Sequence, residues 1–153
     1  MLKLIAGARG LAAVLWIHER PHPMELAATI EAPEHPLLVQ TEQQLREYFA
    51  GERDTFAIPL EIRGSEFQRH VWAILQTIPY GETRSYGEVA KLAGDPTAVR
   101  AVGGAVNKNP IAIIVPCHRV IGASGKLVGF GGGLANKSFL LQLEDRRRNP
   151  VLF

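Results

Sequence analysis

Helix start and stop signals in the second half of the chain constrain its fold more than any other feature. "SEFQ" at 65–68 has the serine-to-glutamine spacing of a capping box, and "SYGE" at 85–88 repeats the pattern with glutamate. Gly94 then supplies a helix end, and Asp95-Pro96 follows at once as an N-cap and first helical residue. Two short helices separated by so tight a turn are typical of a helix-turn-helix.

The first part of the chain has the pattern of a small sheet with one helix. The apolar stretches "LKLIAG" and "LAAVLWI" flank a turn at 8–10, and further alternation follows in "ELAATIEA". "TEQQLREYFAG" predicts a helix capped by Thr41 and ended by Gly51, and "FAIPLEI" predicts one more strand. We therefore expect an α+β fold, with an N-terminal sheet-containing lobe at 1–62 and a mostly helical lobe at 63–153.

Charge is distributed unevenly between these two parts. The net charge is +2, but residues 1–62 hold five Lys/Arg against nine Asp/Glu, whereas residues 63–153 hold twelve against six. A basic C-terminal part favours a polyanionic partner, although a basic surface is more often simply solvated. His18, His22 and His35 lie among prolines and are interpreted as surface or loop residues rather than metal ligands.

The helix that follows Asp95-Pro96 has two contrasting faces. Its apolar face carries three valines at helical spacing: Val99, Val102 and Val106. The opposite face carries Arg100, Gly103, Gly104 and Asn107. Each glycine inside a helix costs up to about 1 kcal/mol relative to alanine, so the pair needs a reason. Tight packing on a neighbouring helix is one reason, and close approach of a nucleic-acid backbone is the other.

The chain has a single cysteine, Cys117, in the stretch "VPCHRVIG". One cysteine excludes an internal disulfide and a multi-cysteine zinc or iron–sulfur site, so we expect no metal. The apolar run after Asn109-Pro110 predicts a buried strand that ends at the thiol. A lone cysteine is most often a small buried hydrophobic residue, but the adjacent His118 and Arg119 are cations that would depress a thiol pKa.

The adjacency of thiol and imidazole limits the chemistry. Consecutive side chains of an extended segment point to opposite sides, so Cys117 and His118 would meet only through a water, with Glu144 as a candidate to orient the imidazole. An unrelated thiol hydrolase would need a histidine distant in sequence. His70, the other histidine after residue 62, lies in a predicted helix as a surface or packing residue.

Three stretches of the sequence resemble the O6-alkylguanine-DNA alkyltransferase family. They are "FQRHVWAILQTIPYGETRSYGEVAKLAG", "RAVGGAVNKNPIAIIVPCHRVIG" and "GGLANKSFLLQLE", and the resemblance extends over roughly residues 65 to 145. Residues 1–62 resemble the variable N-terminal lobe of the family only loosely. The resemblance implies that the sulfur of Cys117 attacks the alkyl carbon on O6 of a damaged guanine and that guanine leaves. The thioether product implies that each molecule acts once.

The resemblance also implies roles for residues around the thiol. His118 would act on Cys117 through a water, and Glu144 would complete the relay. Tyr86 would donate a proton as negative charge develops on guanine, and Asn109 would shape the segment around the thiol. The alkylated base would be held by Val120, Phe130, Gly131 and Gly132. Phe130 stands where many members of the family have tyrosine, so a hydrogen bond from that ring is lost.

Double-stranded DNA carrying O6-alkylguanine is the implied partner, bound through its minor groove. Arg100 would enter the duplex and fill the gap left by the flipped nucleotide, while Gly87, Gly103 and Gly104 would meet the DNA backbone. Extruding a base costs a few kcal/mol, which basic charge and backbone contacts offset. O4-alkylthymine is a further candidate substrate, and no cofactor is implied.

Other expectations concern the setting of the protein. The sequence shows no leader pattern and no apolar stretch of membrane-spanning length, so we expect a cytoplasmic, nucleoid-associated protein. We expect a monomer, with cooperative binding along DNA left open. The alternative function is a non-catalytic lesion-binding or regulatory DNA-binding module, which the thiol and its polar neighbours disfavour.

Overall fold

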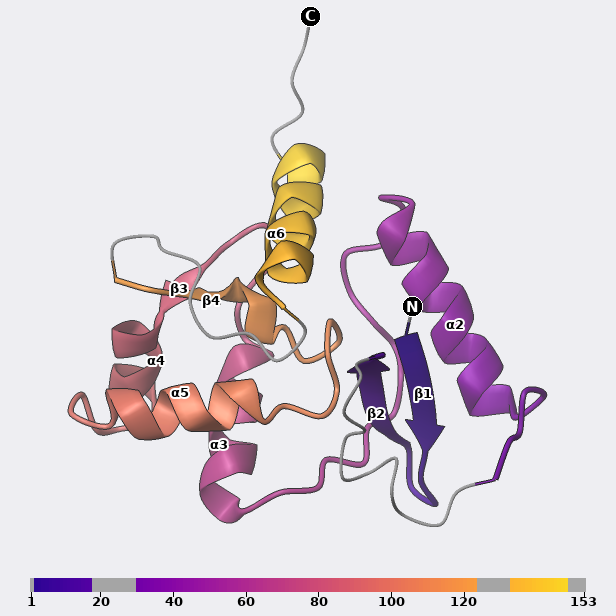
Figure 1. The fold of residues 1–153 in the computed structure, drawn as a ribbon, viewed down its shortest axis with the longest axis horizontal. Coiled ribbons are helices and arrows are strands. Elements are labelled where there is room, and N and C mark those ends of the chain that lie inside the picture. The colour runs from indigo at the N-terminus through magenta and orange to yellow at the C-terminus, as the bar shows by residue number, and fades with distance from the viewer. Residues whose placement is uncertain (1, 18–29, 124–132, 149–153) are drawn as a thin grey trace, which may run out of the picture.

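A computed structural model describes residues 2–17, 30–123 and 133–148. Figure 1 shows β1, β2 and α2 on one side of the molecule and the remaining helices on the other. The strands are β1 (Leu2–Ala6), β2 (Leu11–Trp16), β3 (Arg84–Ser85) and β4 (Val120–Ile121). The helices are α2 (Pro36–Phe49), α3 (Glu66–Leu75), α4 (Tyr86–Leu92), α5 (Val99–Asn107) and α6 (Leu134–Arg148), with a 3₁₀ turn at Cys117–Arg119. The predicted α+β fold is confirmed.

The N-terminal hairpin forms as predicted, but the helix after it starts earlier than expected. β1 and β2 pair antiparallel. α2 begins at Pro36, where the fixed φ of proline suits the first helical position, and the His35 side chain accepts a hydrogen bond from Leu37 N at 3.1 Å. Thr41 as N-cap is therefore wrong. It is buried inside the helix, and its hydroxyl donates to Leu37 O at 2.7 Å.

The further strands predicted for this lobe are not strands among the described residues. In "FAIPLEI" only Leu60 makes a bridge, parallel to Leu11. Pro59 has no N–H to continue a ladder, and its carbonyl accepts from Leu11 N at 2.8 Å. Residues 25–29 of "ELAATIEA" lie outside the described residues, and 30–32 have no regular structure.

Both capping boxes are present, and they fix where α3 and α4 begin. Ser65 caps α3 with Gln68, and Ser85 caps α4 with Glu88. Gly94 follows α4 at φ +94, a conformation that favours glycine. Asp95, in contrast, does not cap α5, which begins at Val99. Its carboxylate instead accepts from the backbone N–H and the hydroxyl of Thr97, forming a turn before the helix.

The apolar run before Cys117 is buried as predicted, but it is not a strand. Only Ile111 bridges to β2, and the chain then turns, with Ile113 at φ 72. The cause is the Asn109 side chain, whose Nδ2 donates to Val115 O at 2.8 Å and whose Oδ1 accepts from Ile111 N at 3.0 Å. These side-chain bonds fold the segment back, so the thiol leaves it in a 3₁₀ turn.

One hydrophobic core joins the two lobes. Most of β2 is buried, and Val14 pairs with the segment before the thiol through Val14 N to Pro110 O at 2.9 Å and Ala112 N to Val14 O at 3.0 Å. Tyr48 enters the same core from α2. The segment that leads to Cys117 is therefore held between the N-terminal lobe and the helices. None of the described helices is long and apolar enough to cross a membrane.

Candidate active site

Cys117 opens the 3₁₀ turn and is only 6% exposed. Burial raises the pKa of its thiol, while the Asn109 side chain and the charge of Lys137 act in the opposite direction. The expected depression of this pKa by neighbouring cations is therefore wrong as a net effect. The Arg119 guanidinium forms an ion pair with Glu144 rather than with the sulfur. The thiol consequently needs a base before it can attack as a thiolate.

His118 and Glu144 form a buried pair beside the thiol. His118 Nε2 lies 2.6 Å from Glu144 Oε2, and both side chains are at most 1% exposed. Burial opposes ionisation of Glu144, but the hydrogen bond and charge of His118, and then those of Arg119, lower its pKa to about 2. Burial lowers the pKa of His118 despite the favourable charge of Glu144, and Arg119 and Lys137 act in the same direction as burial.

These pKa directions define the tautomer of His118. A neutral imidazole beside a carboxylate carries its proton on Nε2 and donates it to Glu144. Nδ1 is then the basic nitrogen. It is buried and has no hydrogen-bond partner among the described protein groups. A 3₁₀ turn at Cys117–Arg119 replaces the predicted extended segment. Because successive side chains of such a turn diverge by about 120°, it is compatible with a contact between thiol and imidazole through a water.

Arg119 fixes the carboxylate from a second direction. Its Nε donates to Glu144 Oε1 at 2.8 Å, and its Nη1 donates to Ile78 O at 2.7 Å. Gly81 N also donates to Glu144 Oε1, at 3.4 Å. Glu144 is thus buried on α6 and held in one orientation.

Tyr86 reaches the site through a short strand pair. β3 and β4 run parallel, with Arg84 opposite Val120 and Ser85 opposite Ile121, so the start of α4 lies beside the chain that leaves the thiol. Burial and then the charge of Cys117 raise the pKa of Tyr86. Its hydroxyl therefore holds its proton more tightly while the sulfur carries a negative charge.

Lys137 is a site residue that the sequence reasoning missed. Its side chain is 0% exposed, its Nζ donates to Val120 O at 2.5 Å, and it lies 5.9 Å from the Tyr86 ring centroid. A signal for it exists in the sequence. Lys137, Leu140 and Glu144 recur at helical spacing, so a carboxylate that contacts His118 brings this lysine to the same face of the helix.

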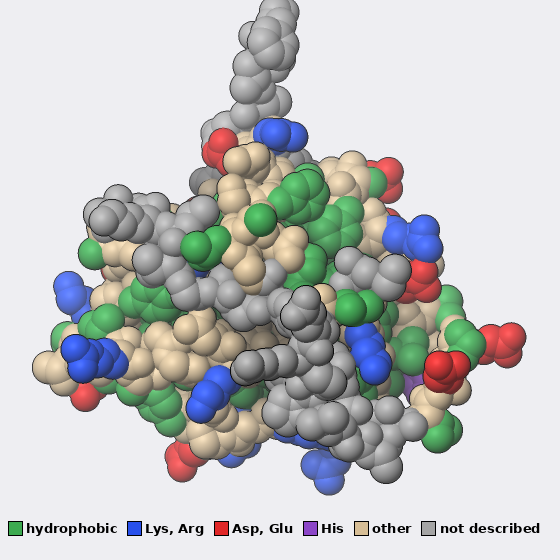
Figure 2. Space-filling view, in the orientation of Figure 1, with side chains coloured by type: hydrophobic (Ala, Val, Ile, Leu, Met, Phe, Trp, Pro, Cys, Tyr) green, Lys and Arg blue, Asp and Glu red, His purple; other side chains and the backbone are tan. Residues whose placement is uncertain are grey.

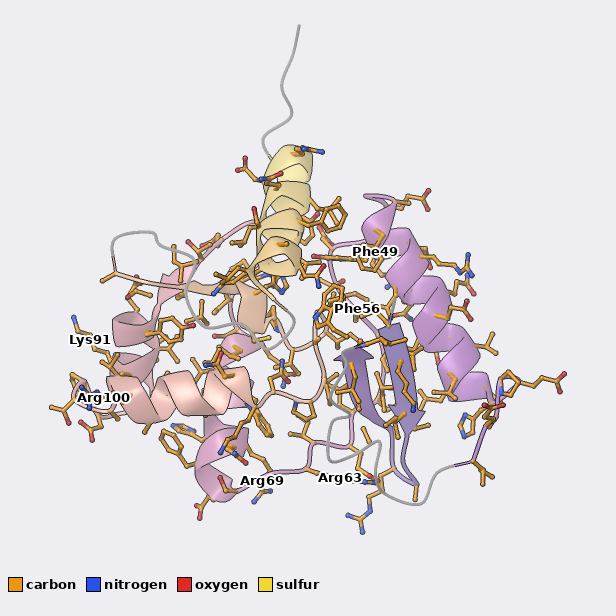
Figure 3. All side chains as sticks on the ribbon, viewed as in Figure 1. Phe49, Phe56, Arg63, Arg69, Lys91 and Arg100 are labelled. Atoms are coloured by element: carbon orange, nitrogen blue, oxygen red, sulfur yellow. The ribbon has the colours of Figure 1, made fainter. Side chains whose placement is uncertain are left out.

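The residues predicted to bind DNA lie on the surface of α4 and α5. Figure 3 shows Lys91 and Arg100 at the same outer end of these helices, and Figure 2 shows basic side chains over this side of the molecule. A Cβ at Gly104 would meet no described atom within 4 Å, one at Gly103 would lie 3.9 Å from the Tyr86 ring, and one at Gly87 3.8 Å from Ser85 Oγ. Packing within the described protein therefore does not require these glycines.

The structure brings all five predicted catalytic residues together. Around the 3₁₀ turn it places Cys117, His118, Glu144, Asn109, Tyr86 and the buried Val120. Arg100 lies apart from them on the exposed outer side of α5. Phe130, Gly131 and Gly132 lie outside the described residues.

Comparisons with known proteins match both lobes. Residues 66–146 match the family model "6-O-methylguanine DNA methyltransferase, DNA binding domain", and residues 2–62 match that of its "ribonuclease-like domain". A methylated-DNA--protein-cysteine methyltransferase of Mycolicibacterium paratuberculosis is 68% identical over 109 residues, which are 71% of this chain and 66% of the relative. One of Mycobacterium leprae is 62% identical over 115 residues, which are 75% and 70% of the two chains.

A solved structure extends the similarity to almost the whole chain. The crystal structure of Mycobacterium tuberculosis OGT in complex with DNA has a TM-score of 0.85 and 48% identity. The alignment covers 95% of this chain and 87% of that one. The sequence alignments to the curated relatives, in contrast, span about two thirds of the relatives' own length.

Proposed function

Because the chain belongs to the 6-O-methylguanine DNA methyltransferase family, we propose that it repairs alkylated DNA by direct reversal. The Cys117 sulfur attacks the alkyl carbon on O6 of guanine, so that an S–C bond forms as the C–O6 bond breaks. The electron pair of the broken bond stays on guanine, which takes up a proton. The protein keeps the alkyl group as a thioether and acts once.

The buried arrangement of Cys117, His118 and Glu144 is the observation that carries this proposal. The carboxylate holds the Nε2–H of a neutral imidazole, which leaves Nδ1 to accept a proton. The thiol proton passes to Nδ1 through a water, as expected for side chains that point apart. A thiolate made inside a buried site is poorly solvated, so it is a stronger nucleophile than one in water.

Lys137, Asn109 and Tyr86 complete the chemistry. Lys137 and the Asn109 side chain oppose the effect of burial on the thiol, so they stabilise the thiolate once it forms. Tyr86 donates its phenolic proton to the departing guanine. Transfer of the alkyl group removes the negative charge from sulfur, and with it one cause of the raised pKa of Tyr86. Proton donation is therefore easiest at the moment when guanine needs it.

We propose that α5 and the start of α4 bind the minor groove. Gly103 and Gly104 weaken the helix but serve no packing role among the described residues, which favours close approach of a DNA backbone. Gly87 lies in the first turn of α4, where a backbone contact is again sterically open. Arg100 projects from the exposed side of α5 and would occupy the place of the flipped nucleotide.

The pocket and the setting of the protein are further proposals. Val120 forms one wall for the flipped base, with Phe130, Gly131 and Gly132 as its predicted neighbours. O4-alkylthymine is a second candidate substrate. The protein would act in the cytoplasm, associated with the nucleoid, as a monomer that binds DNA alone or cooperatively. Residues 1–62 and 63–153 are proposed as its N-terminal and catalytic lobes.

A test of the reaction follows the lesion rather than the protein. A duplex with one O6-methylguanine is mixed with increasing amounts of protein, digested to nucleosides and assayed for restored guanine. We expect restored guanine to rise in proportion to protein and then stop, at one lesion per molecule. A lesion that persists while the duplex stays bound would instead support a lesion-binding module.

A further inference from the structure

Tyr48 connects the N-terminal lobe directly to the candidate active site. It lies on α2, its side chain is 0% exposed, and its hydroxyl donates to Glu144 Oε2 at 2.6 Å across 96 residues of sequence. Burial, and then the charge and hydrogen bond of Glu144, raise its pKa. The phenol therefore stays protonated and remains a donor throughout the physiological pH range.

The oxygen that Tyr48 contacts is the same one that holds the imidazole. Glu144 Oε2 accepts from Tyr48 at 2.6 Å, lies 2.6 Å from His118 Nε2 and accepts from Arg119 Nη2 at 3.1 Å. Each additional donor spreads the negative charge of the carboxylate and weakens its attraction for the others. Tyr48 therefore acts on the same bond that sets the basicity and orientation of the imidazole.

We propose that Tyr48 is a positioning residue for alkyl transfer, through which the N-terminal lobe sets the geometry and proton affinity of His118. This inference rests on the proposed function of the His118–Glu144 pair. Tyr48 does not touch the thiol or the lesion. It holds Glu144 Oε2 against the imidazole and limits the pull of the carboxylate on the imidazole proton.

The surroundings of Tyr48 allow its hydroxyl to be tested apart from its ring. The ring packs against Phe49 and Phe56 at centroid distances of 5.4 and 5.6 Å, and against Tyr80 at 6.1 Å. Figure 3 labels Phe49 on α2 and Phe56 on the segment that follows it. Tyr48→Phe keeps these contacts and removes only the hydrogen bond, while Glu144 retains Arg119 and Gly81 as donors.

The charges around His118 determine the direction in which its pKa shifts when the Tyr48 hydrogen bond is lost. Glu144 and Lys137 face it from α6, Arg119 and Cys117 neighbour it in the 3₁₀ turn, and Tyr48 acts from α2 through Glu144. Loss of the Tyr48 donor leaves more negative charge on Oε2, so the pKa of His118 should rise in Tyr48→Phe.

The experiment combines an NMR titration of the free protein with single-turnover kinetics. The ¹⁵N signals of His118, assigned by their loss in His118→Gln, are titrated in the parent and in Tyr48→Phe. We expect the pKa of His118 to rise by about half a unit to one unit, and the acid limb of the pH–rate profile to move to higher pH by the same amount. Phe49→Leu, a neighbour without the hydrogen bond, should lower thermal stability but leave both values unchanged.

A second replacement at position 48 should shift the pKa of His118 in the opposite direction while keeping the tyrosine ring. Site-specific 3-fluorotyrosine at position 48 is a stronger donor, so it should lower the pKa of His118. Unchanged pKa values in both replacements, with repair intact, would overturn the positioning role. A shifted pKa in a protein that transfers no alkyl group would instead leave the contact valid and reject the proposed function, because the NMR titration requires no DNA.

Discussion

The reactivity of the thiol depends on its pKa, on which burial and the neighbouring side chains have opposite effects. Burial raises the pKa of Cys117, and Asn109 and Lys137 partly oppose it. The balance keeps the resting sulfur protonated and therefore unreactive toward other electrophiles. In the proposed reaction, attack requires the relay through His118, so the burial that hinders ionisation would also make the site selective.

Lys137 is the residue whose contribution is most easily measured. Lys137→Met keeps the apolar stem but removes the charge, so the pKa of Cys117 should rise by about one unit. The rate of thiol modification by iodoacetamide at pH 8 should then fall about tenfold, since the thiolate fraction falls tenfold per pKa unit.

A lysine far from the thiol serves as the control for that substitution. Lys91 is exposed on α4, and Lys91→Met should leave the modification rate unchanged. Equal rates in the parent and in Lys137→Met would show that the lysine does not influence the sulfur.

Among the helices, α5 would have to satisfy two opposing requirements, helix stability and the proposed close approach of DNA. Gly104 lowers the stability of the helix, and no described side chain occupies the space beside it. Gly104→Ala should therefore raise the free energy of unfolding by up to about 1 kcal/mol while weakening binding to duplex DNA. Chemical denaturation and fluorescence anisotropy measure the two effects on the same sample.

The reverse exchange on the same helix separates helix propensity from DNA contact. Ala101 is exposed, and Ala101→Gly should lower the free energy of unfolding by up to about 1 kcal/mol. A Gly104→Ala protein that is more stable and binds DNA as tightly as the parent would contradict the proposed interface.

The elements that could be predicted from the sequence are those set by neighbouring residues. Ser65 and Ser85 each form a capping box with a residue three positions later, so these helix starts are visible locally. The turn before Cys117 was not predictable, because the Asn109 side chain replaces the strand ladder that the apolar run suggested. The contact between Tyr48 and Glu144 joins residues 96 apart, and no local pattern indicates it.

At the scale of the whole molecule, one buried carboxylate ties the lobes together. Glu144 receives hydrogen bonds from Tyr48 in the N-terminal lobe and from Arg119 in the C-terminal lobe. Its folded-state pKa is about 2, against an ordinary value of 4.5. A depressed pKa means that the unfolded chain binds the proton more readily, so the ionised form stabilises the fold fully above about pH 4.5.

This stabilisation should disappear as the pH falls from about 4.5 to 2. The loss amounts to about 3 kcal/mol, because one pKa unit corresponds to about 1.4 kcal/mol. The pKa of His118, lowered by burial, adds a further loss that begins as the pH falls below about 6.5. Urea denaturation at a series of pH values measures both losses.

Two glutamine variants test whether Glu144 is the carboxylate responsible for the loss of stability at acid pH. Glu144→Gln should be less stable at neutral pH and should lose the steep dependence below pH 4.5, whereas Glu42→Gln, at an exposed surface pair, should retain it. The lowered pKa values of Glu61 and Asp95 affect all three proteins equally. If the free energy of unfolding of Glu144→Gln fell as steeply below pH 4.5 as that of the parent, the loss could not be assigned to Glu144.

In the proposed reaction, Cys117 accepts one alkyl group from DNA. Peptide mass spectrometry after incubation with a duplex that carries one O6-methylguanine tests it most directly, with Cys117→Ser as the control. We expect one methyl group in place of hydrogen on the Cys117 peptide, never more than one per molecule, and none in the control. An unmodified Cys117 peptide from protein that remains bound to the duplex would contradict it.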